Sequence, residues 1–386
     1  MDEQVAYFDN AATTFPKPEA VYNYADSFYR SSGGNIGRGG NALAVAAGEV
    51  AHQAKDNLRS LYACPAREIA FTASATDALN RILLGMDLNR GDHVYISPFE
   101  HNAVTRPLNH LAKTIGVVLH VLEFDPITLT PQMDAIEESF ESNNPKLVVL
   151  THASNVCGAV IPVLDICRLA KRFEATTVVD MSQTAGLLDL GLEGPEVDFA
   201  VFAGHKTLLG PFGVGGFFFK CGTRLNPVIF GGNGINSVQQ ELPEGVVQMV
   251  EVGSQNTYAI AGLKASTDWI LGQGMDAIQA RERQALDATI AVLEGCGLLT
   301  IVGNGMRCER IGVVSTQFDD YSPDETEMLL GRFGVAVRSG IQCAPYAHRF
   351  LNTLPSGTVR FSVSALTNDS DIAMLRNALN ELRDAG

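Results

Sequence analysis

Short apolar runs alternate with amphipathic stretches of helical length through the first two-thirds of the chain, and this alternation constrains the fold most. Strands separated by helices predict βαβ units and a mainly parallel sheet, here of seven strands. Because the runs are almost continuously apolar, we expect helices to cover both faces of the sheet. The expected strands are residues 68–74, 93–97, 117–123, 146–151, 176–181, 198–203 and 214–219, with helices such as 76–86, 102–115 and 163–173 between them.

The pattern changes after about residue 257, where long helices precede shorter strands. A chain of 386 residues is also too long for one ordinary domain of about 150 residues. We therefore predict a large domain over residues 15–257 and a smaller α/β domain formed by residues 1–14 and 258–386. The smaller domain is expected to contain helices 258–271 and 275–294, strands 312–317, 335–338 and 357–363, a helix capped by Ser322, and a last helix over 368–382.

The composition indicates a globular protein that does not bind nucleic acid. Hydrophobic residues make up 46% of the chain and charged residues 18%, which is typical of a chain that buries a core. The formal charge of −15 provides no positive field to attract phosphates. An acidic N-terminus without an apolar segment, and the absence of any run of about 18 apolar residues, predict no signal peptide, no contact with a membrane and a cytoplasmic location.

The seven cysteines are dispersed, and no two of them form a CxxC pair. An odd and dispersed set argues against a disulfide framework and against a zinc site, so we expect no structural metal.

Small and polar residues follow several of the predicted strands, where parallel α/β sheets bind their ligands. Ser74-Ala75-Thr76 opens a helix and suits an anion such as a phosphate. His101, Asn155 and Asp180 each follow a strand, and Lys206 follows the next one in Ala203-Gly204-His205-Lys206. Each feature alone also fits a helix cap, a turn or a solvated loop. Together they match what pyridoxal phosphate (PLP) requires, which is a lysine imine, an acid beside the pyridinium nitrogen and an anchored phosphate.

The chain resembles the class V aminotransferase family of fold-type I PLP enzymes, and within it the group II cysteine desulfurases, which include the selenocysteine lyase-like enzymes. The resemblance runs from Tyr7 to the Thr-Val-Arg-Phe-Ser near residue 360. It rests on the blocks FTASATDALN, EHNAV, SNVCG, DMSQ, FAGHK, VEVGSQNT and RSGIQCAP. It implies a fold-type I PLP-dependent transferase.

The resemblance also implies how the cofactor is held. Lys206 would form the imine, His101 would stack on the ring, and Asp180 would pair with the ring nitrogen. Further cofactor contacts would come from the backbone of Ala75, from Thr76 and His205 at the phosphate, and from Gln183 and Asn155 near the ring hydroxyl and the substrate carboxylate. Ser254 matches a position that reaches the phosphate of the other subunit, which implies a homodimer with shared sites.

The block around Cys343 indicates the reaction class. In the family it holds a nucleophilic cysteine, so L-cysteine would yield L-alanine and a persulfide on Cys343. Arg360 matches the arginine that grips the substrate carboxylate, and Arg338 flanks the cysteine loop. L-selenocysteine presents the same carboxylate and amine, and a short cysteine loop implies a sulfur-acceptor protein. Three alternatives stay open: a selenocysteine lyase, a class V aminotransferase or β-lyase that forms no persulfide, and a non-catalytic protein that keeps the fold.

The chain departs from the family pattern at several positions. Ala203 stands where many relatives have a phosphate-binding serine, and Asn41 where many have a histidine near the active site. Ile341-Gln342 replaces the pair of histidines common before the cysteine. We therefore expect the thiol to be tuned otherwise, by Arg338 or by His348.

Overall fold

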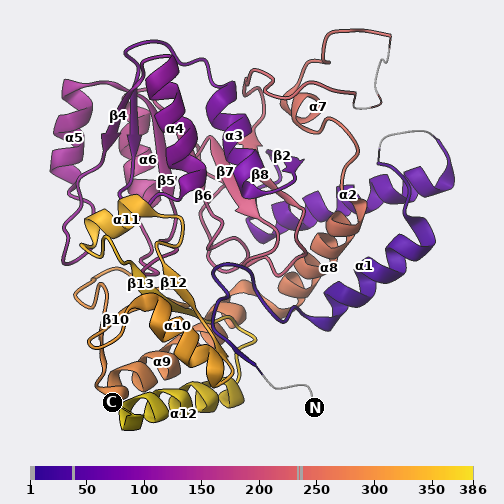
Figure 1. Cartoon of the computed structure of the whole chain (residues 1–386). Helices are drawn as coiled ribbons and strands as arrows, with labels where there is room; N and C mark the ends of the chain where they lie inside the picture. Colours follow the sequence, from indigo (N-terminus) through magenta and orange to yellow (C-terminus); the bar gives the residue numbers. More distant parts are fainter. Residues whose placement is uncertain (1–4, 37–39, 233, 235–237, 386) are drawn as a thin grey trace.

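The computed structural model describes residues 5–36, 40–232, 234 and 238–385, and its centre is a seven-stranded sheet (Figure 1). The strand order is β2-β8-β7-β6-β5-β3-β4. β8 runs antiparallel to β2 and β7, and the other neighbours pair in parallel. The prediction of a mainly parallel seven-stranded sheet is therefore confirmed. The strands are β2 (Arg67–Thr72), β3 (His93–Ile96), β4 (Val118–Val121), β5 (Pro145–Thr151), β6 (Thr176–Asp180), β7 (Phe199–Ala203) and β8 (Gly215–Lys220).

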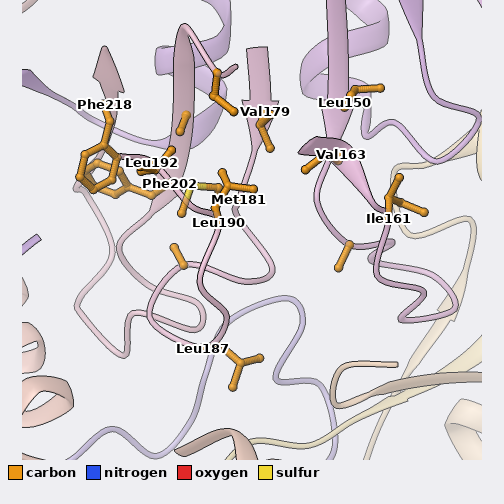
Figure 2. Close-up of a cluster of buried hydrophobic side chains, with 14 of the residues drawn as sticks. Leu150, Ile161, Val163, Val179, Met181, Leu187, Leu190, Leu192, Phe202 and Phe218 are labelled. Atoms are coloured by element: carbon orange, nitrogen blue, oxygen red, sulfur yellow. The ribbon is translucent and has the colours of Figure 1, made fainter. Parts of the chain in front are cut away.

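Successive strand residues point to opposite faces of this sheet. Because both faces carry buried apolar side chains, helices cover each of them. Val179 of β6 packs in one cluster with side chains of α2, α6 and α8, whereas its neighbour Val178 packs in a second cluster with side chains of α3 and α4. Figure 2 shows part of the first cluster, in which Val179 lies near Met181. The helices in this part of the chain are α1 (Glu19–Ser32), α2 (Ala42–Leu61), α3 (Ala75–Gly85), α4 (Asn102–Thr114), α5 (Met133–Ser142), α6 (Val163–Arg172), α7 (Val246–Val250) and α8 (Thr257–Gln273).

Helices α1, α2 and α5 are additions to the elements predicted from the sequence. α1 and α2 both pack against α8, which is buried along much of its length. None of the helices that the structure describes has the length and apolar character needed to cross a membrane.

A separate four-stranded sheet, ordered β12-β13-β10-β9, forms in the C-terminal part of the chain (Figure 1). A two-stranded parallel sheet joins Ala6 of β1 to Val335 of β11, so the N-terminal segment packs with the C-terminal elements. The predicted strand 335–338 is in fact two strands, because β11 pairs with β1 whereas β12 pairs with β13. The elements are β1 (Ala6–Tyr7), α9 (Met275–Cys296), β9 (Leu299–Ile301), β10 (Val313–Phe318), α10 (Pro323–Arg332), β11 (Val335–Ala336), β12 (Arg338–Gly340), α11 (Pro345–Phe350), β13 (Thr358–Ser362) and α12 (Asp369–Ala385).

The predicted start of α10 is confirmed. The Ser322 hydroxyl accepts a hydrogen bond from the backbone N–H of Glu325, and the Glu325 carboxylate accepts one from the backbone N–H of Ser322. This reciprocal pair satisfies two of the donors that a helix start leaves free. The division of the chain at residues 14 and 257 into two domains stays a prediction.

Candidate functional site

A cavity of about 250 Å³ lies where the carboxyl ends of β2, β5, β6 and β7 meet. The parallel strands bring their following loops to one edge of the sheet, as expected for an α/β fold. Residues around β12 and β13 close the cavity from the other side. Every predicted site residue except Ser254 lines it: Ala75, Thr76, His101, Asn155, Asp180, Gln183, His205, Lys206, Arg338, Cys343 and Arg360.

One end of the cavity is suited to an anion. The Ser74 side chain caps α3, and Ala75 and Thr76 are the first residues of that helix, where backbone N–H groups lack helical partners. Gly215 permits the close approach of β8, because a Cβ there would lie 2.8 Å from the backbone nitrogen of Ala75. His205 adds a buried Nδ1 that has no hydrogen-bond partner among the described residues. Burial, helped by nearby lysines, lowers the pKa of His205 to about 4, so the ring is neutral at pH 7.

Lys206 and Asp180 follow the ends of neighbouring strands and line the same cavity. Asp180 is the last residue of β6, and its Oδ1 accepts hydrogen bonds from the backbone N–H (2.9 Å) and the hydroxyl of Ser182. These bonds fix the carboxylate. Desolvation lowers the pKa of Lys206 to about 8, although the negative charge of Asp180 opposes this shift. About a tenth of the Lys206 amine is therefore unprotonated, and nucleophilic, at pH 7.

His101 contributes a neutral imidazole to the cavity wall. It caps α4, and its Nδ1 accepts a hydrogen bond from the backbone N–H of Ala103 at 3.0 Å. Because Nδ1 is the acceptor, the ring proton resides on Nε2. Burial first, and then the charge of Lys206, lower the pKa of His101 to about 4.

Arg360 is almost completely buried and is held from two sides. Its Nη2 lies 2.6 Å from Oδ1 of Asp9, and its Nη1 donates to the backbone oxygen of Asn155 at 3.0 Å. Its Nε is buried and has no partner among the described residues. Arg360 also lines the cavity, which places its guanidinium beside a ligand bound there. Burial lowers the pKa of Arg360, and the Asp9 carboxylate acts in the opposite direction.

Two amide side chains at the cavity already have protein partners. Gln183 donates to the backbone oxygen of Ala11 at 3.0 Å, and Asn155 donates to the backbone oxygen of Gln342 at 2.8 Å. The Asn155 contact ties the predicted substrate region to the loop of Cys343, whose side chain is exposed to the cavity.

Three residues lie outside this cavity: Ser254, which is expected at the phosphate of the other subunit, Asn41 and His348. Ser254 is exposed outside the cavity, where its hydroxyl accepts a hydrogen bond from Asn35. Asn41 does not line the cavity, and its side chain caps α2. His348 is buried against the side chain of Gln342 and does not line the cavity with the thiol.

Sequence reasoning missed the roles of Asp9, Ser182 and Gln342. Asp9 lies inside the N-terminal block of the resemblance, but its partner Arg360 is 351 residues away, so only the fold reveals the pair. Ser182 had a usable signal, because a serine two residues after a strand-end aspartate is placed to hydrogen-bond that carboxylate.

Comparison with known proteins identifies the family. Residues 6–375 match the family described as aminotransferase class-V. A probable cysteine desulfurase of Halalkalibacterium halodurans is 30% identical, with 98% of this chain and 93% of that protein covered. One from Pyrococcus abyssi is 29% identical, with 99% and 95% covered.

Solved structures of cysteine desulfurases are also similar to this chain. The apo structure of a cysteine desulfurase from Thermococcus onnurineus NA1 has a TM-score of 0.89 at 27% identity, with 99% of this chain and 95% of that chain covered. A cysteine desulfurase from Escherichia coli has a TM-score of 0.86 at 23% identity, with 100% and 96% covered, and this likeness speaks for the fold. The predicted fold type is confirmed. The chain belongs to the class V aminotransferase family.

Proposed function

We propose that this protein is a cysteine desulfurase that converts L-cysteine to L-alanine and leaves the sulfur as a persulfide on Cys343. The observation that carries the proposal is one cavity that holds both a lysine of lowered pKa, Lys206, and an exposed thiol, Cys343. The cysteine desulfurases to which the chain is similar over nearly its full length support the same reaction.

We propose pyridoxal 5'-phosphate as the cofactor because the cavity offers the groups that it needs. The start of α3 with Thr76, and the unpartnered Nδ1 of His205, would hold the phosphate. Asp180 would hold the ring nitrogen, and the neutral ring of His101 would stack on the pyridine. Gln183 and Asn155 would lie near the ring hydroxyl. When bound, PLP supplies an electron sink that eases loss of the α-proton of an amino acid.

The chain's own residues supply the remaining steps. Arg360 would bind the carboxylate of L-cysteine, with Arg338 at the same wall of the cavity. The Lys206 amine would take up the α-proton. The thiolate of Cys343 would then attack the substrate sulfur, so that a sulfur–sulfur bond forms as the carbon–sulfur bond breaks. The carbon keeps that electron pair and takes up a proton, which completes the methyl group, and the Lys206 amine would return a proton to the α-carbon to give alanine.

We also propose that the protein acts as a homodimer. Ser254 lies outside its own subunit's cavity, and this position supports a role at the phosphate of the partner.

A sulfur-acceptor protein would collect the persulfide from the exposed Cys343. A thiolate that cycles through a persulfide needs reducing surroundings, which supports a cytoplasmic location.

Replacement of Cys343 by alanine separates this reaction from the alternatives. Cys343→Ala should abolish release of alanine and sulfide from L-cysteine, because no thiolate remains to attack the substrate sulfur. Cys221→Ala, which removes another exposed cysteine outside the cavity, should match the wild type. Quantifying alanine, sulfide and, from L-selenocysteine, selenide checks this. Retained sulfide release by Cys343→Ala would contradict the proposal and favour a lyase. Selenide release from L-selenocysteine by the wild type, without sulfide release from L-cysteine, would favour a selenocysteine lyase.

Arg360→Lys should raise KM for L-cysteine by about tenfold or more, because an ammonium group replaces the planar fork of donors that fits a carboxylate. Its positive charge still accompanies Asp9, so the fold should persist. Arg332→Lys, on the exposed side of α10, should leave KM unchanged. Steady-state kinetics with L-cysteine measure both variants. An unchanged KM for Arg360→Lys would rule out Arg360 as the carboxylate site.

The pKa of about 8 at Lys206 predicts how cofactor capture depends on pH. The unprotonated amine reacts, so the rate at which cofactor-free protein captures added PLP covalently should rise with pH and level off above about 8. A lysine with the ordinary pKa of 10.5 would keep accelerating well beyond that pH. Stopped-flow absorbance on the wild type, with Lys206→Ala as the silent control, provides the measurement. A rate that still rises steeply at pH 10 would contradict the assignment.

The homodimer is tested through Ser254. The wild type should sediment as a dimer, and Ser254→Ala should release PLP faster than the wild type while remaining dimeric. Analytical ultracentrifugation and a dialysis time course measure these properties. A monomer that keeps its PLP, or unchanged release by Ser254→Ala, would contradict the shared phosphate site.

A further inference from the structure

The loop that carries Cys343 has an unusual backbone. Gln342 and Cys343 are consecutive residues with φ angles of +41° and +57°, and Gly340 before them has a φ of +87°. Side-chain-bearing residues rarely adopt such left-handed conformations, and two in succession persist only where surrounding contacts hold them. The position of the thiol therefore depends on what anchors this loop.

The backbone of the loop is tied to two other segments, the start of α4 and the loop after β5. The backbone oxygen of Gln342 accepts a hydrogen bond from the Asn155 side chain at 2.8 Å, and the backbone oxygen of Cys343 accepts one from the N–H of Asn102 at 2.7 Å. Both partners follow strands of the large sheet. These bonds set where the loop sits against the cavity.

The Gln342 side chain anchors the loop on its other side. It is buried, and its Nε2 donates to the backbone oxygens of Thr358 at 3.1 Å and Arg338 at 3.3 Å. Its Oε1 lies 2.9 Å from Nε2 of His348 and also accepts from the Thr358 hydroxyl at 3.3 Å. Gln342 thus joins β12, β13 and α11 around the loop.

His348 is the fixed partner of Gln342. Because the amide nitrogen of Gln342 faces two carbonyl groups, its oxygen faces His348, whose Nε2 must carry the proton. The other ring nitrogen, Nδ1, then accepts from the hydroxyl of Thr353 at 2.7 Å. Both nitrogens are therefore engaged, and burial lowers the pKa of His348 to about 4, so the ring stays neutral. His348 has no ring nitrogen left to act on the thiol.

We infer that Gln342 is a positioning residue for the sulfur-transfer reaction. Together with His348 it holds Cys343 in its left-handed conformation, with the thiol presented to the cavity beside Lys206. This inference rests on the proposed function. It assigns a purely geometric role to Gln342, which stands where the family commonly has a histidine, and to its partner His348. It replaces the expectation that His348 tunes the thiol.

Gln342→Met tests the inference, because methionine has a similar length but makes none of the hydrogen bonds. A loop released from its anchor misplaces the nucleophile, so kcat for alanine formation should fall about 10- to 100-fold. KM for L-cysteine should stay within about twofold of wild type, since Arg360 is untouched. Gln317→Met, on the exposed side of β10 in the same sheet, should leave both constants unchanged. An unchanged kcat for Gln342→Met would overturn the inference.

Two variants of His348 separate positioning from proton transfer. Glutamine keeps a neutral N–H donor for Gln342 but does not titrate, whereas phenylalanine keeps the ring shape without the donor. His348→Gln should therefore retain most of kcat with the wild-type pH profile, and His348→Phe should lose activity as Gln342→Met does. Equal loss in both His348 variants, with an altered pH profile, would instead identify His348 as an acid or base and overturn the geometric role.

A measurement that does not depend on turnover tests the positioning role of Gln342 independently of the proposed function. Alkylation of Cys343 by iodoacetamide, followed by peptide mass spectrometry, should be severalfold faster in Gln342→Met than in wild type, because a freed loop samples more open conformations. Thermal unfolding of each variant checks that the fold is intact. If wild type forms no alanine, the proposed function fails, while the alkylation rates still decide whether Gln342 holds the loop. Equal rates in folded variants would overturn the inference.

Discussion

Lys206 and Arg360 are cations placed where little water reaches them, and the site depends on how their charge is balanced. Desolvation lowers the pKa of both, while Asp180 acts against the shift at Lys206 and Asp9 against that at Arg360. Desolvation keeps the lysine partly neutral although Asp180 opposes this, whereas the ion pair with Asp9 keeps the guanidinium charged in the same cavity of about 250 Å³. An unpaired charge here would cost several kcal/mol. The two acids therefore shape the chemistry as much as the two cations do.

The large sheet was predictable because its signal is local. Strands such as β5 and β6 are continuous apolar runs, and the structure shows them within one or two residues of the expected bounds. The pairing of β1 with β11 was not predictable from the same pattern, because a two-residue strand has no periodicity and its partner lies far along the chain. The split of residues 335–338 between two sheets has the same origin.

The site was partly predictable for a related reason. His101, Asp180 and Lys206 follow strands, and one rule of α/β sheets places them together. The contacts that tune them join distant segments, as in the Arg360–Asp9 pair, and no local pattern reveals these. Family resemblance supplied Cys343 and Arg360, whereas the hypothesis that His348 tunes the thiol came from its closeness in sequence, and both of its ring nitrogens are engaged elsewhere. The fold places the His348 ring against the side chain of Gln342, the residue that stands where the family commonly has a histidine. This contact joins two residues whose pairing no sequence pattern indicates.

The central claim is that the sulfur of L-cysteine passes to the thiol of Cys343, and a single-turnover experiment tests it most directly. PLP-loaded protein is mixed with one equivalent of L-cysteine per subunit and no other thiol, then quenched and digested. The mass of the peptide that contains Cys343 is measured by mass spectrometry, and alanine is quantified. We expect one alanine per subunit and one added sulfur atom on that peptide. Alanine without added sulfur on Cys343, or the sulfur on another cysteine such as Cys221, would contradict it.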